Sequence, residues 1–137
     1  MPAYFPQIHW KERACVSARL AYSAYLYMKV AVIGSRSLRC DLEHYIPAGA
    51  TLIISGGARG IDRCAAAYAA SHGIPIKEYR PQYALYGKAA PIRRNIEIIK
   101  EADLVLAFWD GQSKGTAFVI RECRRRGKHV KIFYLKK

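Results

Sequence analysis

Three features are scarce in this sequence: long hydrophobic runs, paired cysteines and acidic residues. No stretch approaches the roughly 20 consecutive apolar residues of a transmembrane helix, so we expect a soluble, cytoplasmic protein without a membrane partner. The four cysteines, at positions 15, 40, 64 and 123, form no CxxC pair and have no histidine at metal-ligand spacing. This pattern argues against a disulfide framework and a zinc site, and we expect neither a metal nor a cofactor.

The shortage of acidic residues leaves a large positive charge. Lys and Arg number 23 against 10 Asp and Glu, so the 137 residues carry a formal net charge of +13. Such a charge favours a polyanionic or phosphorylated partner. The alternative interpretation is a solvated helix face followed by a basic tail. The last segment carries one acid, Glu122, against Arg121, Arg124, Arg125, Arg126, Lys128, Lys131, Lys136 and Lys137.

The length fits one domain with a single core, but the first 27 residues differ from the rest. They contain Pro2, Pro6, Trp10 and a patch rich in Tyr and Ala. We interpret residues 1–27 as an N-terminal extension, which is either the product of a start codon assigned too far upstream or a helix that packs on the domain. The domain itself is expected over residues 28–137.

From residue 28 onward, short runs rich in Val and Ile alternate with helix-like stretches. Each apolar run is continuous, as expected where helices cover both faces of a parallel sheet. With right-handed crossovers, the pattern predicts an α/β protein with a Rossmann-like, doubly wound open sheet of about five parallel strands in a single domain. The longest irregular stretch is expected at residues 80–91. Strands are predicted near 28–34, 51–55, 75–79, 103–109 and 129–135, and helices near 38–46, 60–72, 91–102 and 115–127.

Ligands of open parallel sheets bind beyond the carboxyl ends of the strands, so the residues that follow each strand are candidates for a site. The first strand is followed by Gly34, Ser35 and Arg36. Glycine allows close backbone approach, a serine hydroxyl caps a helix or binds a phosphate oxygen, and arginine clamps an anion. The alternative is a capped helix with an exposed arginine.

The second strand leads into a glycine-rich loop that opens a helix. Consecutive glycines permit positive φ angles and a nest of N–H groups around an anion, and a helix N-terminus favours the same charge. Asp62 at the helix start either interacts with the helix dipole or accepts hydrogen bonds from a ribose or a base. The ligand-binding candidates in this segment are Ser55, Gly56, Gly57, Arg59, Gly60 and Asp62.

Two more segments contribute candidates. After the fourth strand, Asp110 is a candidate for ribose binding or acid–base catalysis, and Gly115 and Thr116 begin another helix. In the helix that starts near Pro91, we predict that Arg93 and Asn95 bind the ligand, although capping is the alternative for Asn95. Because Arg93 and its neighbour at position 94 point in different directions, at most one of them is expected to face the pocket.

In this order, the segments resemble the SLOG superfamily, the Rossmann-like group of the DNA-processing protein DprA/Smf and the LOG cytokinin-activating phosphoribohydrolases. The small YspA/YpsA-related members are most similar. The resemblance covers about residues 28–135 and is carried by residues 34–36, 55–62, 87–95 and 108–116. It implies a nucleotide-related ligand, such as a nucleoside phosphate, an ADP-ribose derivative or single-stranded nucleic acid, and it makes a homodimer an additional expectation.

The resemblance leaves three functions open: binding of a small nucleotide-derived ligand, sequence-independent binding of single-stranded nucleic acid, and N-glycosidic hydrolysis. LOG enzymes carry a catalytic glutamate three positions after the threonine of their Gly-Thr pair. Here that position is Val119, and Glu122 lies one helical turn further along. Hydrolysis would therefore need Asp62 or Asp110 as its catalytic carboxylate.

Overall fold

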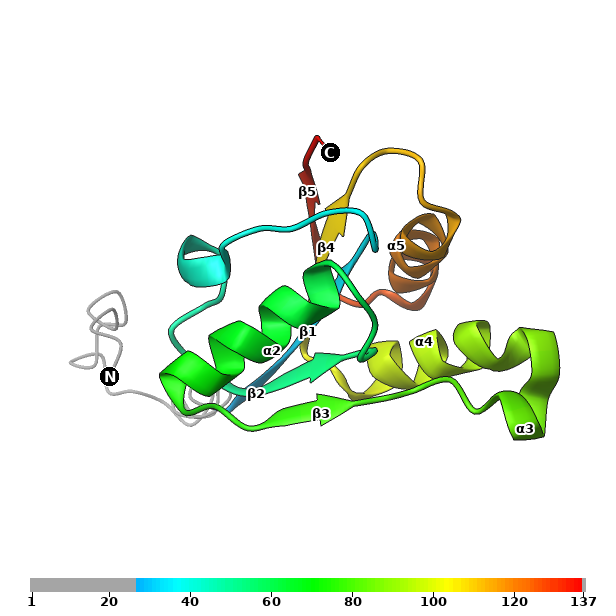
Figure 1. The fold of residues 1–137 in the computed structure, drawn as a ribbon, viewed down its shortest axis with the longest axis horizontal. Coiled ribbons are helices and arrows are strands. Elements are labelled where there is room, and N and C mark those ends of the chain that lie inside the picture. The colour runs from blue at the N-terminus through cyan, green and yellow to red at the C-terminus, as the bar shows by residue number, and fades with distance from the viewer. Residues whose placement is uncertain (1–26, 137) are drawn as a thin grey trace, which may run out of the picture.

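The computed structural model describes residues 27–136, which form one five-stranded sheet flanked by helices (Figure 1). All strand pairs are parallel, and the strand order is β3-β2-β1-β4-β5. This confirms the predicted α/β architecture. The strands are β1 (Met28–Gly34), β2 (Ala50–Ser55), β3 (Ile76–Glu78), β4 (Leu104–Trp109) and β5 (Val130–Tyr134).

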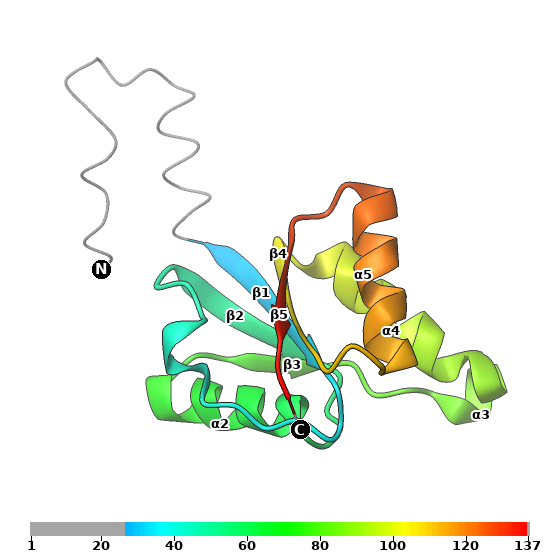
Figure 2. The same cartoon turned by 90° about the horizontal axis from the view of Figure 1, so that it is seen from above.

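Helices cover both faces of the sheet (Figure 2). Helix α2 (Ile61–His72) lies on one face, and α4 (Ala90–Glu101) and α5 (Lys114–Arg126) lie on the other. Successive side chains of a strand point to opposite faces, so Val30 and Val32 of β1 join the core cluster beneath α2, whereas Ala31 and Ile33 join the cluster beneath α4 and α5. The continuous apolar run of β1 therefore reflects two separate cores.

The two edge strands, β3 and β5, are less buried than their continuous apolar sequence runs predict. In β3, Ile76 is half-buried and the other two residues are exposed. In β5, Lys131 and Tyr134 are exposed and the remaining residues are half-buried. Each edge strand has only one neighbour in the sheet, so the expectation of burial on both faces does not hold for β3 or β5.

The helix predicted near residues 38–46 is wrong. Only Leu42–His44 form a single 3-10 turn, η3. The Asp41 side chain accepts a hydrogen bond from the N–H of Glu43 at 3.0 Å and so starts a new turn there. Pro47 disfavours helical geometry at the residue before it. The side chains at positions 38, 42 and 46 are spaced as on a helix, but they reach the core from an irregular segment.

The stretch predicted to be irregular, residues 80–91, is largely helical. It contains α3 (Tyr83–Tyr86) and the 3-10 helix η4 (Gly87–Ala89), and α4 follows directly. Figure 2 shows α3 at the right-hand end of the molecule, beyond α4 and away from β1. The irregular part is thus limited to the few residues that connect β3 to α3.

The apolar sides of α2 and α5 pack on the protein's own sheet. Ala65 and Ala69 of α2 and Val119 and Ile120 of α5 are buried within the protein itself. These faces therefore give no support to a second copy, and the homodimer stays a prediction. Among residues 27–136, no helix has the length and apolar character needed to cross a membrane. The proposed N-terminal extension lies outside the described residues except for Tyr27.

Candidate functional site

The strand order creates a crevice beside β1. The chain leaves β1 towards β2 on one side, while β4 lies on the other side, and ligands of open α/β sheets bind at such a switch point. Gly34 at the end of β1 is paired with Phe108 of β4, and the N–H of Ser35 donates to the Phe108 carbonyl at 3.2 Å. The loops after β1 and β4 therefore flank the same crevice.

A hollow of about 380 Å³ lies at this point, and we call it the switch-point hollow. Its walls come from the loops after β1, β2 and β4 and from the first turns of α2, α4 and α5. The structure thus brings together most residues that the sequence predicts for the site. The predicted residues lining this hollow are Gly34, Ser35, Arg36, Gly56, Asp62, Asn95, Asp110, Gly115 and Thr116.

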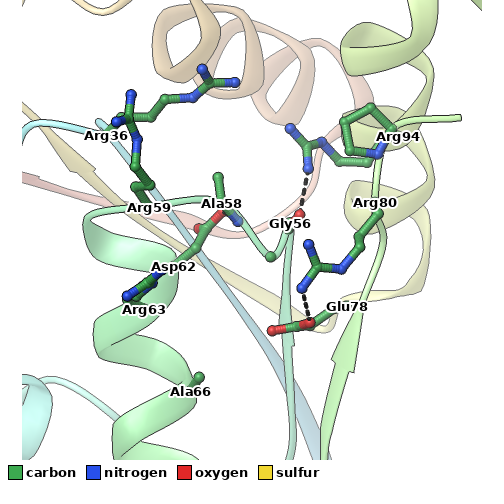
Figure 3. A pocket seen from close by; sticks show the side chains of 12 residues that line it. Arg36, Gly56, Ala58, Arg59, Asp62, Arg63, Ala66, Glu78, Arg80 and Arg94 are labelled. Atoms are coloured by element: carbon green, nitrogen blue, oxygen red, sulfur yellow. Dashed lines mark hydrogen bonds and ion pairs between the residues drawn. The ribbon is translucent and has the colours of Figure 1, made fainter. Parts of the chain in front are cut away.

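An adjoining arginine hollow of about 450 Å³ lies towards β3 (Figure 3). Figure 3 shows Arg94 reaching it from one side and Arg36 and Arg59 lying on the other. Gly57 and Arg59, both predicted from the sequence, line this hollow and not the first. The two hollows share a wall and form one site, and the shared residues are Arg36, Gly56, Ala58, Asp62 and Arg94.

Ser35 has a buried hydroxyl that lacks a partner. The residue is 2% exposed and lines the switch-point hollow, and no atom of the described residues makes a hydrogen bond with its Oγ. An unsatisfied buried polar group costs roughly 1–3 kcal/mol. A ligand oxygen in the hollow would supply the missing bond, which distinguishes Ser35 from a serine that only caps a helix.

Ser113, across the hollow, is such a cap. Its Oγ accepts from the Thr116 N–H at 3.4 Å and lies 3.3 Å from the Thr116 hydroxyl. Asp110 shapes the loop before it, because Asp110 Oδ1 accepts from the N–H groups of Gln112 and Ser113, each at 2.8 Å. The first-turn N–H groups of a helix have no intrahelical acceptor, so this loop presents the N-terminus of α5 to the hollow.

Asp62 is the buried acid of the site. It is 7% exposed, and its Oδ2 accepts from the Ala58 N–H at 3.0 Å. Burial raises the pKa of Asp62, and the Ala58 hydrogen bond and the nearby Arg94 charge only partly oppose that rise. A buried acid with a raised pKa in a cleft is typical of functional sites.

Arg94, and not Arg93, lies in the site. Arg94 Nη1 donates to the carbonyls of Gly56 at 2.7 Å and Tyr79 at 3.1 Å, and its buried Nε has no partner among the described residues. The Arg93 guanidinium instead lies 4.5 Å from the Tyr86 ring centroid, outside both hollows. Of the two arginines, only Arg94 lines these two hollows, so the choice of Arg93 is corrected for them. Arg93 and Arg94 both line a smaller third hollow towards α3.

The glycines mainly allow protein segments to approach one another. A Cβ at Gly56 would lie 2.3 Å from Arg94 Nη1, and a Cβ at Gly60, where φ is 71°, would lie 2.4 Å from the Arg36 carbonyl oxygen. Gly60 and the buried Ser55, whose Oγ accepts from the Gly57 N–H at 3.2 Å, line neither hollow. They position the loop but do not face a ligand.

Sequence reasoning missed Arg63, Arg80 and Glu78, all of which line the arginine hollow. Arg80 follows β3 and is paired with Glu78 at 3.0 Å. The signal for Arg80 is its position beyond the carboxyl end of the third strand, where ligands of open parallel sheets bind. Within residues 27–136, no group of three His, Cys, Asp or Glu side chains is arranged to hold a metal ion.

Comparison with known proteins supplies one relative. The chain is 34% identical over 93 residues to the Gene 61 protein of Mycobacterium phage D29, a match that spans 64% of this chain and 74% of the phage protein. The chain belongs to the Gene 61 protein family. No model of a described protein family and no solved structure matches the chain. Because the name of the Gene 61 protein states no activity, the function must be argued from the site.

Proposed function

We propose that this protein binds a small, phosphorylated, nucleotide-derived ligand and is a SLOG-related protein, as the resemblance of its motifs implies. The phosphate would lie in the switch-point hollow. The observation that carries the proposal is the Ser35 hydroxyl, which is buried, without a partner among the described residues, and beside the N-terminus of α5. A phosphate oxygen accepts hydrogen bonds from both kinds of donor.

The charge of the site supports an anionic ligand. Five arginines line the arginine hollow, against the two carboxylates Asp62 and Glu78. Even with both carboxylates ionised, the lining keeps an excess of three positive charges, and Glu78 is already paired with Arg80. The positive charge is therefore largely uncompensated, and a phosphorylated ligand would offset it through charge-assisted hydrogen bonds to the guanidinium groups.

The shared wall between the hollows suits the sugar of such a ligand. Asp62 lies on this wall and is mostly an acceptor, since one of its oxygens is bound to the Ala58 N–H. A ribose hydroxyl is a fitting donor for the remaining acceptor sites. This arrangement favours a nucleotide over inorganic phosphate, because the phosphate alone would leave Asp62 without a ligand contact.

Hydrolysis of the LOG type is less favoured than binding. Val119, at the position of the LOG glutamate, is buried in the core. The Glu122 carboxylate accepts hydrogen bonds from Arg125 and Arg126, which lower its pKa to about 2, and it lies in the C-terminal half of α5, away from the hollow. A catalytic carboxylate would have to be Asp62 or Asp110.

Binding of a nucleic-acid strand is also less favoured. The basic residues that suggested it cluster at the C-terminal end of α5, whereas the N-terminus of α5 lines the hollow. A helix of 13 residues is about 20 Å long. The basic cluster and the site are therefore at opposite ends of the helix, and a strand would have to span about 20 Å to contact both, whereas a small ligand needs only the hollow.

Calorimetric titration tests the proposal. The ligands are nucleoside mono-, di- and triphosphates, NAD, ADP-ribose and short single-stranded oligonucleotides at two salt concentrations. We expect a small nucleotide to bind, and we expect Arg36→Ala to weaken that binding at least about 10-fold, as loss of a charge-assisted hydrogen bond predicts. Arg125→Ala, at the far end of α5, is the matched control and should change little. Full affinity of Arg36→Ala for every bound nucleotide would contradict the proposal, as would binding of oligonucleotides alone.

A further inference from the structure

A third hollow, of about 200 Å³, lies between the end of β3, α3 and the start of α4. We call it the tyrosine hollow, because the rings of Tyr79 and Tyr86 contribute to its walls together with Arg93, Gln82 and Glu97. Its lining differs from that of the other two hollows. Two tyrosines line it beside three arginines, whereas no aromatic side chain lines either of the other two hollows.

The tyrosine hollow adjoins the proposed phosphate site and shares lining residues with it. Arg80 lines both the tyrosine hollow and the arginine hollow. Arg94 lines all three hollows, and its Nη1 is fixed by the carbonyls of Gly56 and Tyr79. A ligand that contacts Arg94 with its phosphate or sugar therefore has the tyrosine hollow within reach of its other end.

We propose that the tyrosine hollow binds the nucleobase of the ligand, an inference that rests on the proposed function. The Arg93 guanidinium lies 4.5 Å from the Tyr86 ring centroid, so the pair forms a cationic and aromatic platform. Nucleobases stack on both tyrosine rings and arginine planes. The Gln82 amide offers a donor and an acceptor and the Glu97 carboxylate offers acceptors, and neither side chain is hydrogen-bonded to another described residue.

Packing does not account for Tyr86. Its side chain is 41% exposed on a four-residue helix that buries none of its residues. Tyr79, by contrast, has a structural role, since its hydroxyl donates to Glu101 and Lys77 lies 4.9 Å from its ring centroid. Tyr86 is thus the ring that is available to a base. Tyr83, 56% exposed on the same helix and outside the hollow, is the matched control.

The test separates the base from the rest of the nucleotide. Ribose 5-phosphate and the 5′-monophosphates of adenosine, guanosine, cytidine and uridine are titrated into the full chain by calorimetry. We expect at least one nucleotide to bind more tightly than ribose 5-phosphate. Tyr86→Ala should reduce that advantage about 10-fold, in line with base–aromatic stacking, without changing the affinity for ribose 5-phosphate. Tyr86→Phe should retain the advantage, and Tyr83→Ala should behave as the wild type.

Several results would overturn the inference. They are a wild-type protein that binds no nucleotide more tightly than ribose 5-phosphate, and a Tyr86→Ala protein that keeps the advantage of the base or loses affinity for both ligands equally. If Tyr86→Ala does not fold, Tyr86→Leu replaces it, because leucine keeps apolar bulk without a ring. Failure of the proposed function looks different: ribose 5-phosphate and all four nucleotides then fail to bind the wild type.

Discussion

Replacing Ser35 by alanine should separate stability from binding. The Ser35 Oγ is buried and has no partner among the described residues. Removing an unsatisfied buried hydroxyl relieves part of a penalty of roughly 1–3 kcal/mol, and the Cβ that packs in the loop stays. We therefore expect Ser35→Ala to leave the free energy of unfolding unchanged or to raise it by up to about 1 kcal/mol.

The same substitution should weaken binding of the ligand. A hydrogen bond to a charged group contributes about 1.5–3 kcal/mol, so loss of the Ser35 bond to a phosphate oxygen should raise the dissociation constant about 10- to 150-fold. Denaturation by urea measures the first effect and calorimetric titration the second, on the same preparation. An unchanged or raised free energy of unfolding together with a lower ligand affinity is the combination expected of Ser35→Ala.

Ser113→Ala is the matched control. Ser113 caps α5 from the opposite wall of the hollow and bonds Thr116 within the protein, so its loss should cost about 1 kcal/mol of unfolding free energy. A Ser35→Ala protein that is destabilised as much as Ser113→Ala and keeps full affinity for the nucleotide would contradict the proposed role of the Ser35 hydroxyl. In that case the Ser35 hydroxyl would have a partner within the protein.

Two more predictions concern the shared wall. Gly56→Ala places a Cβ 2.3 Å from Arg94 Nη1, which displaces the guanidinium from the two carbonyls it donates to. We expect the free energy of unfolding, measured by urea denaturation, to fall by about 2 kcal/mol, and nucleotide binding to weaken. Wild-type values for both would contradict the contact. Burial raises the folded-state pKa of Asp62 above its ordinary value of 3.8, so the stability it contributes is present below that value and is lost as pH rises through the raised pKa. Asp62→Asn should lack this component, so its stability relative to the wild type should rise as the pH increases above about 3.8. A difference in unfolding free energy between the two proteins that stays constant as the pH rises would contradict the raised pKa of Asp62.

The sheet could be predicted because both of its faces are covered. The bounds of β1 agree with the prediction, since Val30 to Ile33 are buried on alternating faces and give a continuous apolar run. The segment from Leu38 to Ile46 misled the prediction for the opposite reason. Its apolar spacing matches a helix, but the local chemistry of Asp41 and Pro47 confines helical structure to one turn. Local capping overrode periodicity at this point.

The choice between Arg93 and Arg94 could have been made from the sequence. Residues four apart lie on the same face of a helix, and Ile98, four residues after Arg94, is fully buried, as is Ala90 four residues before it. Extending the apolar face of α4 backwards therefore selects Arg94. The contacts of Gly56 could not have been predicted in this way, because its partner Arg94 lies 38 positions further along the chain.

The positions of the hollows also bear on the two acids predicted to be catalytic. With a phosphate at Ser35 and a base at Tyr86, the sugar and its glycosidic bond pass the shared wall, where Asp62 lies. Asp110 lies on the far side of the switch-point hollow, and its Oδ1 holds the turn that leads into α5. Burial also raises the pKa of Asp62, which is the direction that favours a proton donor. If this site does cleave its ligand, we expect Asp62 to be the carboxyl that assists, and Asp110 to orient the helix N-terminus that is proposed to bind the phosphate.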